Sequence, residues 1–244
     1  MPVLIKARTS YSRLPPIRKT DAVTLNSTSD LHRVILQIRD ILDRFVFNST
    51  ATRALMTIRI YLAGPDVFLR NALEIGERKK AMCMEYGFEG KFPFDASEHG
   101  KSSSTTIFQR NRDAMKSVNI GLFNLSPFRG ANADVGTVFE LGYMLAAGKR
   151  VFGYSSSAST YRTRVAKASN KLIEESNLVW DDDGLIVEDF NLVDNLMVCE
   201  GIMQSGGFIE TMEEDGANQA ERLAAFGGFR RCLQRISEIK DDLM

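Results

Sequence analysis

Short, continuous apolar runs alternate with longer amphipathic stretches between residue 56 and about residue 154. Apolar side chains at helical spacing separate the runs and predict helices over about 68–86, 106–117 and 135–147. Strands that are apolar along their whole length are typical of a parallel sheet with helices on both faces, so we predict the α/β class. The runs expected to form strands are 58–63, 88–94, 118–125 and 150–154.

The pattern is less regular after residue 154. Residues 155–184 are polar and predict a loop that holds one helix at about 161–175. Further along, the residues at 185–190 and 195–198 are again largely apolar, and the stretch 201–218 is rich in loop-forming residues. Helical spacing predicts a final amphipathic helix over about 219–240.

The first 55 residues differ in composition from the rest of the chain. They hold nine Lys or Arg and four Asp, and the first twenty contain a Pro-Pro pair and no acidic residue. We interpret 1–55 as a basic, mobile extension of a domain at 56–244, with one amphipathic helix over 31–45. An acid-poor start that contains arginine also fits a transit peptide. A further hypothesis is that translation begins at Met56, two residues before the first strand.

Composition narrows the class of protein. The chain has 244 residues, and its 31 Lys plus Arg equal its 31 Asp plus Glu, which argues against a nucleic-acid polymer as partner. Three widely spaced cysteines and two distant histidines give neither a disulfide framework nor a zinc site. No run approaches the roughly 20 apolar residues of a membrane helix. We therefore expect a cytoplasmic protein without a membrane partner.

In an open parallel sheet, ligands bind beyond the carboxyl ends of the strands. The corresponding loops are 63–68, 94–97, 126–134 and the loop that begins at 155. No GxGxxG follows the first strand and no GxxxxGK(S/T) occurs, so the sequence indicates neither a dinucleotide cofactor nor a P-loop. Carboxylates and glycines are frequent in these loops instead, and we expect no cofactor.

Asp134 and Glu140 stand out among the carboxylates. Asp134 lies just before the helix at 135–147, and Glu140 follows six residues later. Gly136 lies four residues before Glu140, on the same helix face, and leaves room above its carboxylate for a small ring. The spacing alone also fits a simpler interpretation, in which Asp134 caps the helix and Glu140 is solvated.

The most distinctive motifs occur in order along the chain: Tyr61-Leu-Ala-Gly-Pro-Asp-Val-Phe68, Gly87-Phe-Glu-Gly-Lys-Phe-Pro-Phe-Asp95, Asn124-Leu-Ser-Pro-Phe-Arg-Gly130, Ala133-Asp-Val-Gly-Thr-Val-Phe-Glu-Leu-Gly-Tyr143, Val187-Glu-Asp-Phe190 and Asp194-Asn-Leu-Met197. Together they resemble the nucleoside 2-deoxyribosyltransferase family over roughly 58–200, and the last two motifs resemble the last strand region of that family. The resemblance implies a flavodoxin-like, doubly wound, five-stranded parallel sheet, in agreement with the pattern above. Segment 155–184 is longer than the compact family pattern, and 1–55 has no counterpart in it.

The resemblance also assigns roles to residues. Glu140 takes the position of the nucleophile, which attacks the anomeric carbon and forms a covalent deoxyribosyl-glutamate, as in a retaining glycosidase. Asp113 takes the position of the aspartate that contacts the base and delivers a proton to it. Tyr61 takes that of the tyrosine that hydrogen-bonds the nucleophile. The residues expected to bind substrate are Asp134, Asn195, Gly64, Phe68, Gly136 and Ser126.

By the same resemblance, the protein exchanges 2-deoxyribose between nucleobases in nucleotide salvage. Its partners would be 2-deoxyribonucleosides and free nucleobases, and it would form a homo-oligomer in which Asn195 reaches a site in the neighbouring subunit. Two other functions stay open. One is a hydrolase of 2-deoxynucleoside 5′-monophosphates, with Ser126 and Arg129 as candidate phosphate ligands. The other is a non-catalytic nucleotide-binding module, because a fold does not by itself imply a function.

Overall fold

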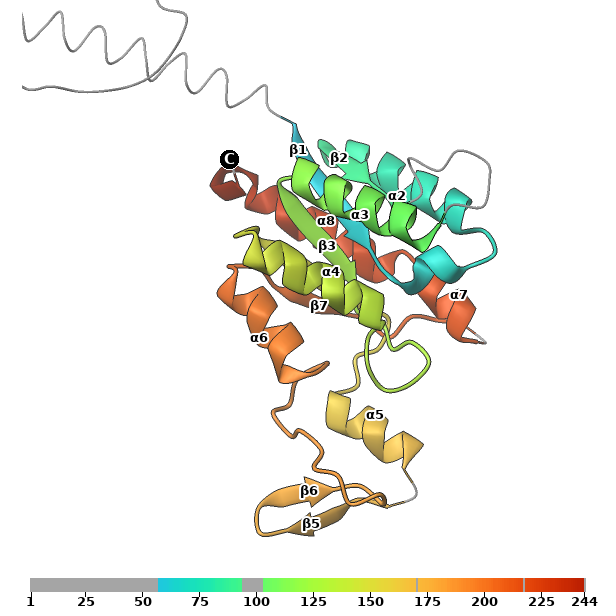
Figure 1. Cartoon of the computed structure of the whole chain (residues 1–244), viewed down its shortest axis with the longest axis vertical. Helices are drawn as coiled ribbons and strands as arrows, with labels where there is room; N and C mark the ends of the chain where they lie inside the picture. The colour runs from blue at the N-terminus through green and yellow to red at the C-terminus, as the bar shows by residue number, and fades with distance from the viewer. Residues whose placement is uncertain (1–56, 94–102, 170, 217, 244) are drawn as a thin grey trace, which may run out of the picture. The chain divides into compact units, whose positions relative to one another are not determined.

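The computed structural model describes residues 57–93, 103–169, 171–216 and 218–243 (Figure 1). The expectations for the 1–55 extension, for its helix at 31–45 and for Met56 lie outside these residues, as does the loop 94–97. No helix in the described part of the chain is both long and apolar enough to cross a membrane.

Five strands form one parallel sheet in the order β2-β1-β3-β4-β7. They are β1 (Ile58–Ala63), β2 (Phe88–Lys91), β3 (Ile120–Asn124), β4 (Val151–Ser155) and β7 (Ile209–Thr211). Ile60 of β1 is paired with Gly90 of β2 on one side and Ile120 of β3 on the other. The strand order therefore reverses at β1, as in flavodoxin-like sheets, and ligands bind beyond the carboxyl ends at this switch point. The predicted doubly wound α/β fold is confirmed.

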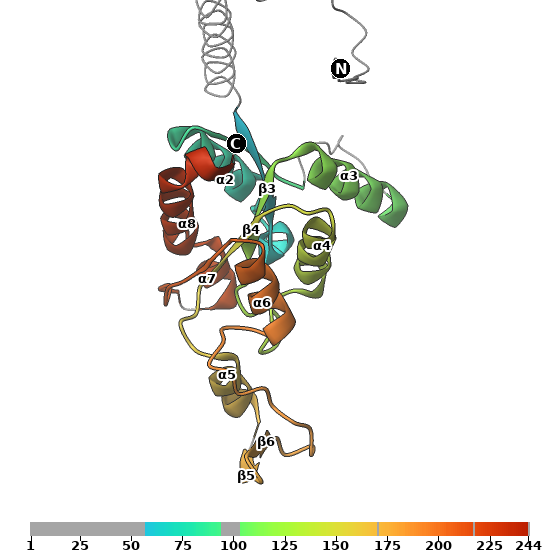
Figure 2. The same cartoon turned by 90° about the vertical axis from the view of Figure 1, so that its left-hand side faces the viewer.

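Helices cover both faces of the sheet (Figure 2). One layer contains α2 (Ala72–Glu85) and α8 (Gly227–Glu238), and the other contains α3 (Ser104–Ser117), α4 (Val135–Ala146) and α6 (Leu196–Gln204). Successive side chains of a strand point to opposite faces, so Ile60 and Leu62 pack in the α2/α8 layer while Tyr61 and Ala63 pack in the α3/α4/α6 layer. This alternation aims the phenol of Tyr61 at α3 and α4.

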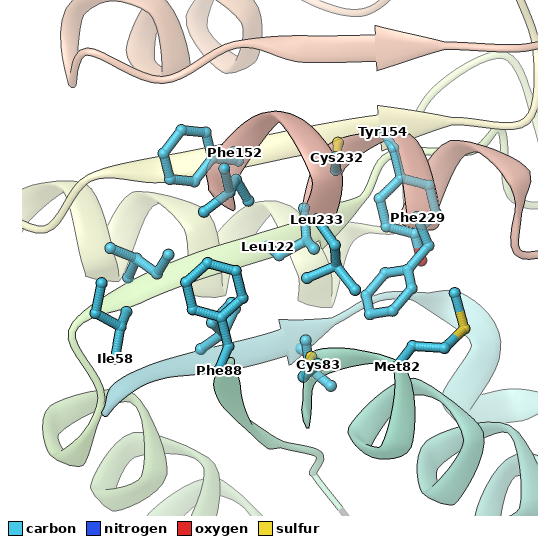
Figure 3. Packing of buried hydrophobic residues seen from close by; sticks show 14 of the residues in the cluster. Ile58, Met82, Cys83, Phe88, Leu122, Phe152, Tyr154, Phe229, Cys232 and Leu233 are labelled. Carbon is cyan, nitrogen blue, oxygen red and sulfur yellow. The ribbon is translucent and has the colours of Figure 1, made fainter. Parts of the chain in front are cut away.

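The α2/α8 layer is filled by apolar side chains (Figure 3). Met82 and Cys83 of α2 pack with Phe229 and Leu233 of α8, and each of these side chains is at most 5% exposed. Burial of apolar area at this density is the main source of stability for such a sheet.

The last part of the sheet differs from the sequence expectation. The apolar run at 195–198 forms the start of α6, because the side chain of Asn195 caps that helix by accepting a bond from the Met197 amide at 3.0 Å. The fifth strand is β7, within the stretch 201–218 that the sequence predicted as loop-rich. Its sequence, Ile-Glu-Thr, is not a continuous apolar run, and its three residues are only half buried.

Other boundaries also shift. The helix expected over 68–86 divides into a short 3-10 helix, η1 (Pro65–Phe68), and α2. The helix expected over 161–175 ends earlier, as α5 (Tyr161–Ala168), and is followed by an antiparallel pair, β5 (Ile173–Glu175) and β6 (Leu178–Trp180). The final helix divides into α7 (Gln219–Ala224), α8 and η2 (Lys240–Leu243).

Candidate active site

Helix α4 carries the central carboxylate of the site. The helix begins at Val135 because the side chain of Asp134 caps it, accepting bonds from the Thr137 amide at 2.9 Å and the Thr137 hydroxyl at 3.0 Å. Glu140 follows in the second turn and is partly buried. The capping role predicted for Asp134 is thus present, whereas Glu140 is not the solvated side chain of the simpler interpretation.

Two donors from different elements converge on one oxygen of Glu140. The hydroxyl of Tyr61, a fully buried residue of β1, donates to Oε1 of Glu140 at 2.7 Å. The side-chain amide of Asn111, on α3, donates to the same Oε1 at 3.1 Å. The sheet, α3 and α4 therefore fix the orientation of one carboxylate together.

The surroundings of Glu140 oppose its ionisation. Burial raises the pKa of its carboxyl to about 7, the bonds from Tyr61 and Asn111 act in the lowering direction, and the negative charge of Asp134 adds to the rise. Burial and the Glu140 charge raise the pKa of the Tyr61 phenol, so Tyr61 stays protonated and remains a donor. Oε2 of Glu140 has no hydrogen-bond partner among the described residues.

Glu140 lines a cavity of about 350 Å³ between α3 and α4. Its walls are mostly apolar, and Phe108 of α3 faces Phe139 of α4 with ring centroids 6.1 Å apart. Gly136 lies in the wall, where a Cβ atom would stand 3.1 Å from Oδ2 of Asp134. The full lining is Ser104, Ile107, Phe108, Asn111, Met115, Gly136, Phe139 and Glu140. An oriented carboxylate in an apolar cleft suits attack on an electrophilic carbon that carries a flat ring.

A sequence model described as "Nucleoside 2-deoxyribosyltransferase" matches residues 60–197, the segment that contains this site. The chain belongs to the nucleoside 2-deoxyribosyltransferase family. An uncharacterized protein of Schizosaccharomyces pombe is 34% identical over 62% of this chain and 79% of its own. The solved 2-desoxiribosyltransferase from Leishmania mexicana is similar at 25% identity and a TM-score of 0.51, over 74% of this chain and 97% of that one.

The loop after β1, where the family resemblance places substrate contacts, is held by a buried polar network. Nζ of Lys79 lies 2.5 Å from Oδ2 of Asp66, and both side chains are at most 2% exposed. The side-chain amide of Asn124 donates to Oδ1 of Asp66 at 3.1 Å. A Cβ atom on Gly64 would lie 2.4 Å from Oδ1 of Asp66, so this position requires glycine. Gly64 therefore permits the close packing of the first loop.

Ser126 belongs to the same network and is buried. Its hydroxyl donates to Oδ1 of Asn124 at 2.5 Å and accepts a bond from the Ser156 amide at 2.9 Å. Ser126 therefore connects the loop after β3 to the loop after β4. Both hydrogen-bonding directions of the hydroxyl are already in use.

Phe68 and Arg129 lie together at the end of the first loop. The ring of Phe68 stacks on that of Phe128, with centroids 5.2 Å apart, and the guanidinium of Arg129 lies over both rings. Phe68 is 58% exposed and is not among the residues that line the Glu140 cavity.

Asp113 and Asn195 are not among the residues that line the Glu140 cavity. Asp113 is exposed on α3, bonded to Arg112 at 3.1 Å, and does not line the cavity. Besides capping α6, Asn195 donates from its side-chain amide to Oε1 of Glu188 at 2.6 Å. Sequence reasoning missed Asn111, two residues before Asp113. The signal that could have found it is helical spacing, since 104, 107, 108, 111 and 115 all fall on one face of α3.

Proposed function

We propose that this member of the nucleoside 2-deoxyribosyltransferase family exchanges the base of 2-deoxyribonucleosides, with Glu140 as the nucleophile. The single observation that carries the proposal is the convergence of Tyr61 and Asn111 on Oε1 of Glu140. These donors hold the carboxylate in one orientation and leave the lone pairs of Oε2 available to a substrate. Among the described residues that line the cavity, Glu140 is the one with an ionisable side chain.

The reaction consists of two displacements at the anomeric carbon. Oε2 of Glu140 bonds to C1′ as the C1′–N bond breaks, and the departing base keeps that electron pair and takes up a proton. A second base then attacks C1′ through a ring nitrogen, loses its proton, and releases the carboxylate. The donors to Oε1 hold Glu140 in one orientation for the first displacement, and they stabilise the negative charge that develops on the carboxylate as it leaves C1′ in the second. Asp134, whose Oδ1 has no partner among the described residues, is the proposed acceptor for a sugar hydroxyl.

The lining of the cavity supports a nucleoside rather than a nucleotide as substrate. No Lys or Arg is present among the described residues that line it. The two candidate phosphate ligands are engaged elsewhere, since Ser126 is buried in a network and Arg129 lies over Phe68 and Phe128. The apolar walls suit a flat base, and a phosphate dianion there would lose its hydration without a cation to replace it.

Base exchange tests the proposal. The full chain is incubated with deoxyinosine and free adenine, and the products are separated by chromatography. We expect deoxyadenosine from the wild-type protein and none from the Glu140→Gln variant. Release of free deoxyribose without deoxyadenosine would indicate a hydrolase. No turnover of nucleoside or of deoxynucleoside 5′-monophosphate would favour a binding module.

The identity of the nucleophile needs a separate measurement. A 2-fluoro sugar analogue slows the second displacement, so a covalent adduct accumulates and can be located by digestion and mass spectrometry. We expect the label on the peptide that contains Glu140. A label on another residue would contradict the mechanism even if base exchange were observed.

From the family resemblance, we also propose that the protein forms a homo-oligomer in which neighbouring subunits share active sites. Asn195 and Met197 lie at the start of α6, and Met197 is 72% exposed, which leaves an apolar side chain free for a neighbouring subunit. We expect a dimer or larger assembly by light scattering. An Asn195→Ala variant should lose activity when pure and regain part of it when mixed with Glu140→Gln protein, because mixed assemblies then contain intact sites. A fully active monomer would contradict shared sites.

A further inference from the structure

A second cavity, of about 220 Å³, lies beyond the carboxyl end of β4. Its walls come from the loop after β4, from α5 and from α7, and Pro127 of the loop after β3 closes one side. No residue is shared with the lining of the Glu140 cavity. The two cavities are therefore separate sites on the same sheet.

Two cations in this second cavity form no ion pair with an acidic residue of the described part of the chain. Lys167 of α5 forms no hydrogen bond or ion pair with any described residue. Arg222 of α7 uses one nitrogen, which donates to the carbonyl of Gly216 at 3.0 Å, and it has no carboxylate partner among the described residues. Both side chains line the cavity, from helices that are far apart in the sequence.

The third cation, Arg164, belongs to the framework of the cavity. It is 8% exposed and paired with Asp194, and it donates to the carbonyls of Ala131, Ser159 and Val193. Its donors are thus occupied by the backbone of three loops. Arg164 fixes the shape of the cavity and leaves Lys167 and Arg222 as the charges open to a ligand.

Three serines of the loop after β4, Ser156, Ser157 and Ser159, line the cavity and add hydroxyl groups to it. The oxygen of Ser157 accepts a bond from the Ser159 amide at 3.3 Å, which leaves the Ser157 hydroxyl hydrogen free to donate. Hydroxyl donors beside an ammonium and a guanidinium make an arrangement suited to the oxygens of a phosphate group.

One acid opposes this charge. Oε2 of Glu213 accepts a bond from the Ala158 amide at 3.0 Å, so the carboxylate is held at the cavity. With Arg164 balanced by Asp194, the remaining charges are two positive and one negative. The net charge offered to a ligand is positive, and Glu213 limits the affinity.

We propose that this cavity is a second binding site, separate from the Glu140 cavity, for a small molecule that carries a phosphate group. Lys167 and Arg222 bind the phosphate oxygens. The ligand would contact the loop after β3, which the side-chain amide of Gln219 already bonds at the Pro127 carbonyl and which leads to Asp134 at the start of α4. A bound ligand would therefore contact α5, α7 and the loop after β3 at the same time.

Inorganic phosphate is the probe for the test. It is titrated into the full-length protein at pH 7.5 and constant ionic strength, and binding is followed by calorimetry and by the thermal midpoint of unfolding. We expect saturable binding and a rise in the midpoint. Lys167→Ala and Arg222→Ala should each weaken binding about tenfold or more, the usual effect of losing a charge-assisted bond.

Two variants serve as matched comparisons. Lys171→Ala removes one positive charge, as Lys167→Ala does, but from an exposed residue that follows α5 and does not line the cavity. This variant should leave phosphate binding unchanged. Glu213→Gln keeps an oxygen for the Ala158 amide but removes the negative charge, and it should tighten binding. Non-saturable binding, or binding that Lys167→Ala leaves intact, would overturn the proposal. Neither result depends on base exchange at Glu140.

Discussion

The phenol oxygen of Tyr61 lies 2.7 Å from Oε1 of Glu140, although 79 positions separate the two residues in the chain. Tyr61 is fully buried in β1, an interior strand of the sheet, whereas Glu140 lies on α4, the helix that Asp134 caps. The bond therefore transmits the rigidity of the sheet to the carboxylate. Asn111 reaches the same oxygen from a third element, α3.

The activity should depend on pH through Glu140. A nucleophilic carboxylate must be ionised, and burial raises the pKa of this group to about 7. We expect kcat/KM to increase with pH, with a midpoint near 7, and to reach a plateau above it. Initial rates of base exchange between pH 5 and 9 check this. A midpoint near 4.5, the ordinary value for glutamate, would contradict the burial of the nucleophile.

Tyr61→Phe should move that midpoint to higher pH. The phenol bond stabilises the ionised form of Glu140, so its loss raises the pKa of the carboxyl further. One hydrogen bond to a charged group is worth about 1.5–3 kcal/mol, which corresponds to a shift of roughly one to two pH units. Circular dichroism should show an intact fold, because the ring remains. An unchanged midpoint would mean that the bond is absent in solution.

Glu140→Gln should abolish transfer and stabilise the fold at alkaline pH. The pKa of Glu140 is raised on folding, so its favourable contribution is complete below 4.5 and is lost as the pH rises through about 7. Glutamine has no charge to bury and still offers an oxygen to Tyr61 and Asn111. The variant should exceed the wild type by about 3 kcal/mol at pH 8 and match it near pH 4.5. Denaturant unfolding at both values measures this, and a constant difference would contradict it.

Variants at Asn111 and Asp113 distinguish the loss of an orienting hydrogen bond from the loss of a proton donor. Asn111→Ala should reduce kcat about tenfold to a hundredfold, because Glu140 loses an orienting donor. The proton-donor role of Asp113 stays a prediction, and Asp113→Asn tests it. A loss that is greatest for bases that leave poorly would support an acid role. An effect that is small and equal for all bases would fit the exposed position of Asp113 beside Arg112.

Two glycines of α4 separate a functional effect from a stabilising one. Gly136→Ala adds a methyl group to the cavity wall, 3.1 Å from Oδ2 of Asp134, and should raise KM. Gly142→Ala lies on the exposed face with open space around it, and should stabilise the helix by about 0.5–1 kcal/mol with unchanged kinetics. Equal KM values for the two variants would exclude Gly136 from substrate contact.

The sequence predicted four of the five strands of the parallel sheet, because β1, β3 and β4 are largely apolar runs and β2 follows directly after Gly87, which ends a helix. It missed β7, whose three residues Ile209–Thr211 are half buried and form no such run. The resemblance placed the family's last strand region at 187–190 and 194–197, whereas Leu196 begins α6, and a short apolar run does not by itself distinguish a strand from the first turn of a buried helix. The cap at Asn195 decides between them, and it is visible only in the structure.

The candidate site shows a similar limit. Spacing on α4 and the family resemblance were sufficient to bring forward Asp134, Gly136 and Glu140. On α3, a carboxylate drew attention to Asp113, yet positions 111 and 113 are about 200° apart around a helix. Asn111 shares its face with Met115, a buried residue, and that face is the one turned to Glu140. Met115, the buried apolar residue four positions after Asn111, was therefore a more informative signal than the carboxylate of Asp113.

The position of Tyr61 in β1, an interior strand of the sheet, also has a kinetic consequence. Backbone amides in the interior of a central strand exchange with solvent only when much of the domain opens, whereas loops beyond the strand ends open locally and often. Substrates that come and go through the α3/α4 cleft would therefore leave the anchor of the nucleophile undisturbed. Adjustment to different bases would be confined to the helices and loops around the cleft. The hydrogen bond from Tyr61 would keep the Glu140 carboxylate in place.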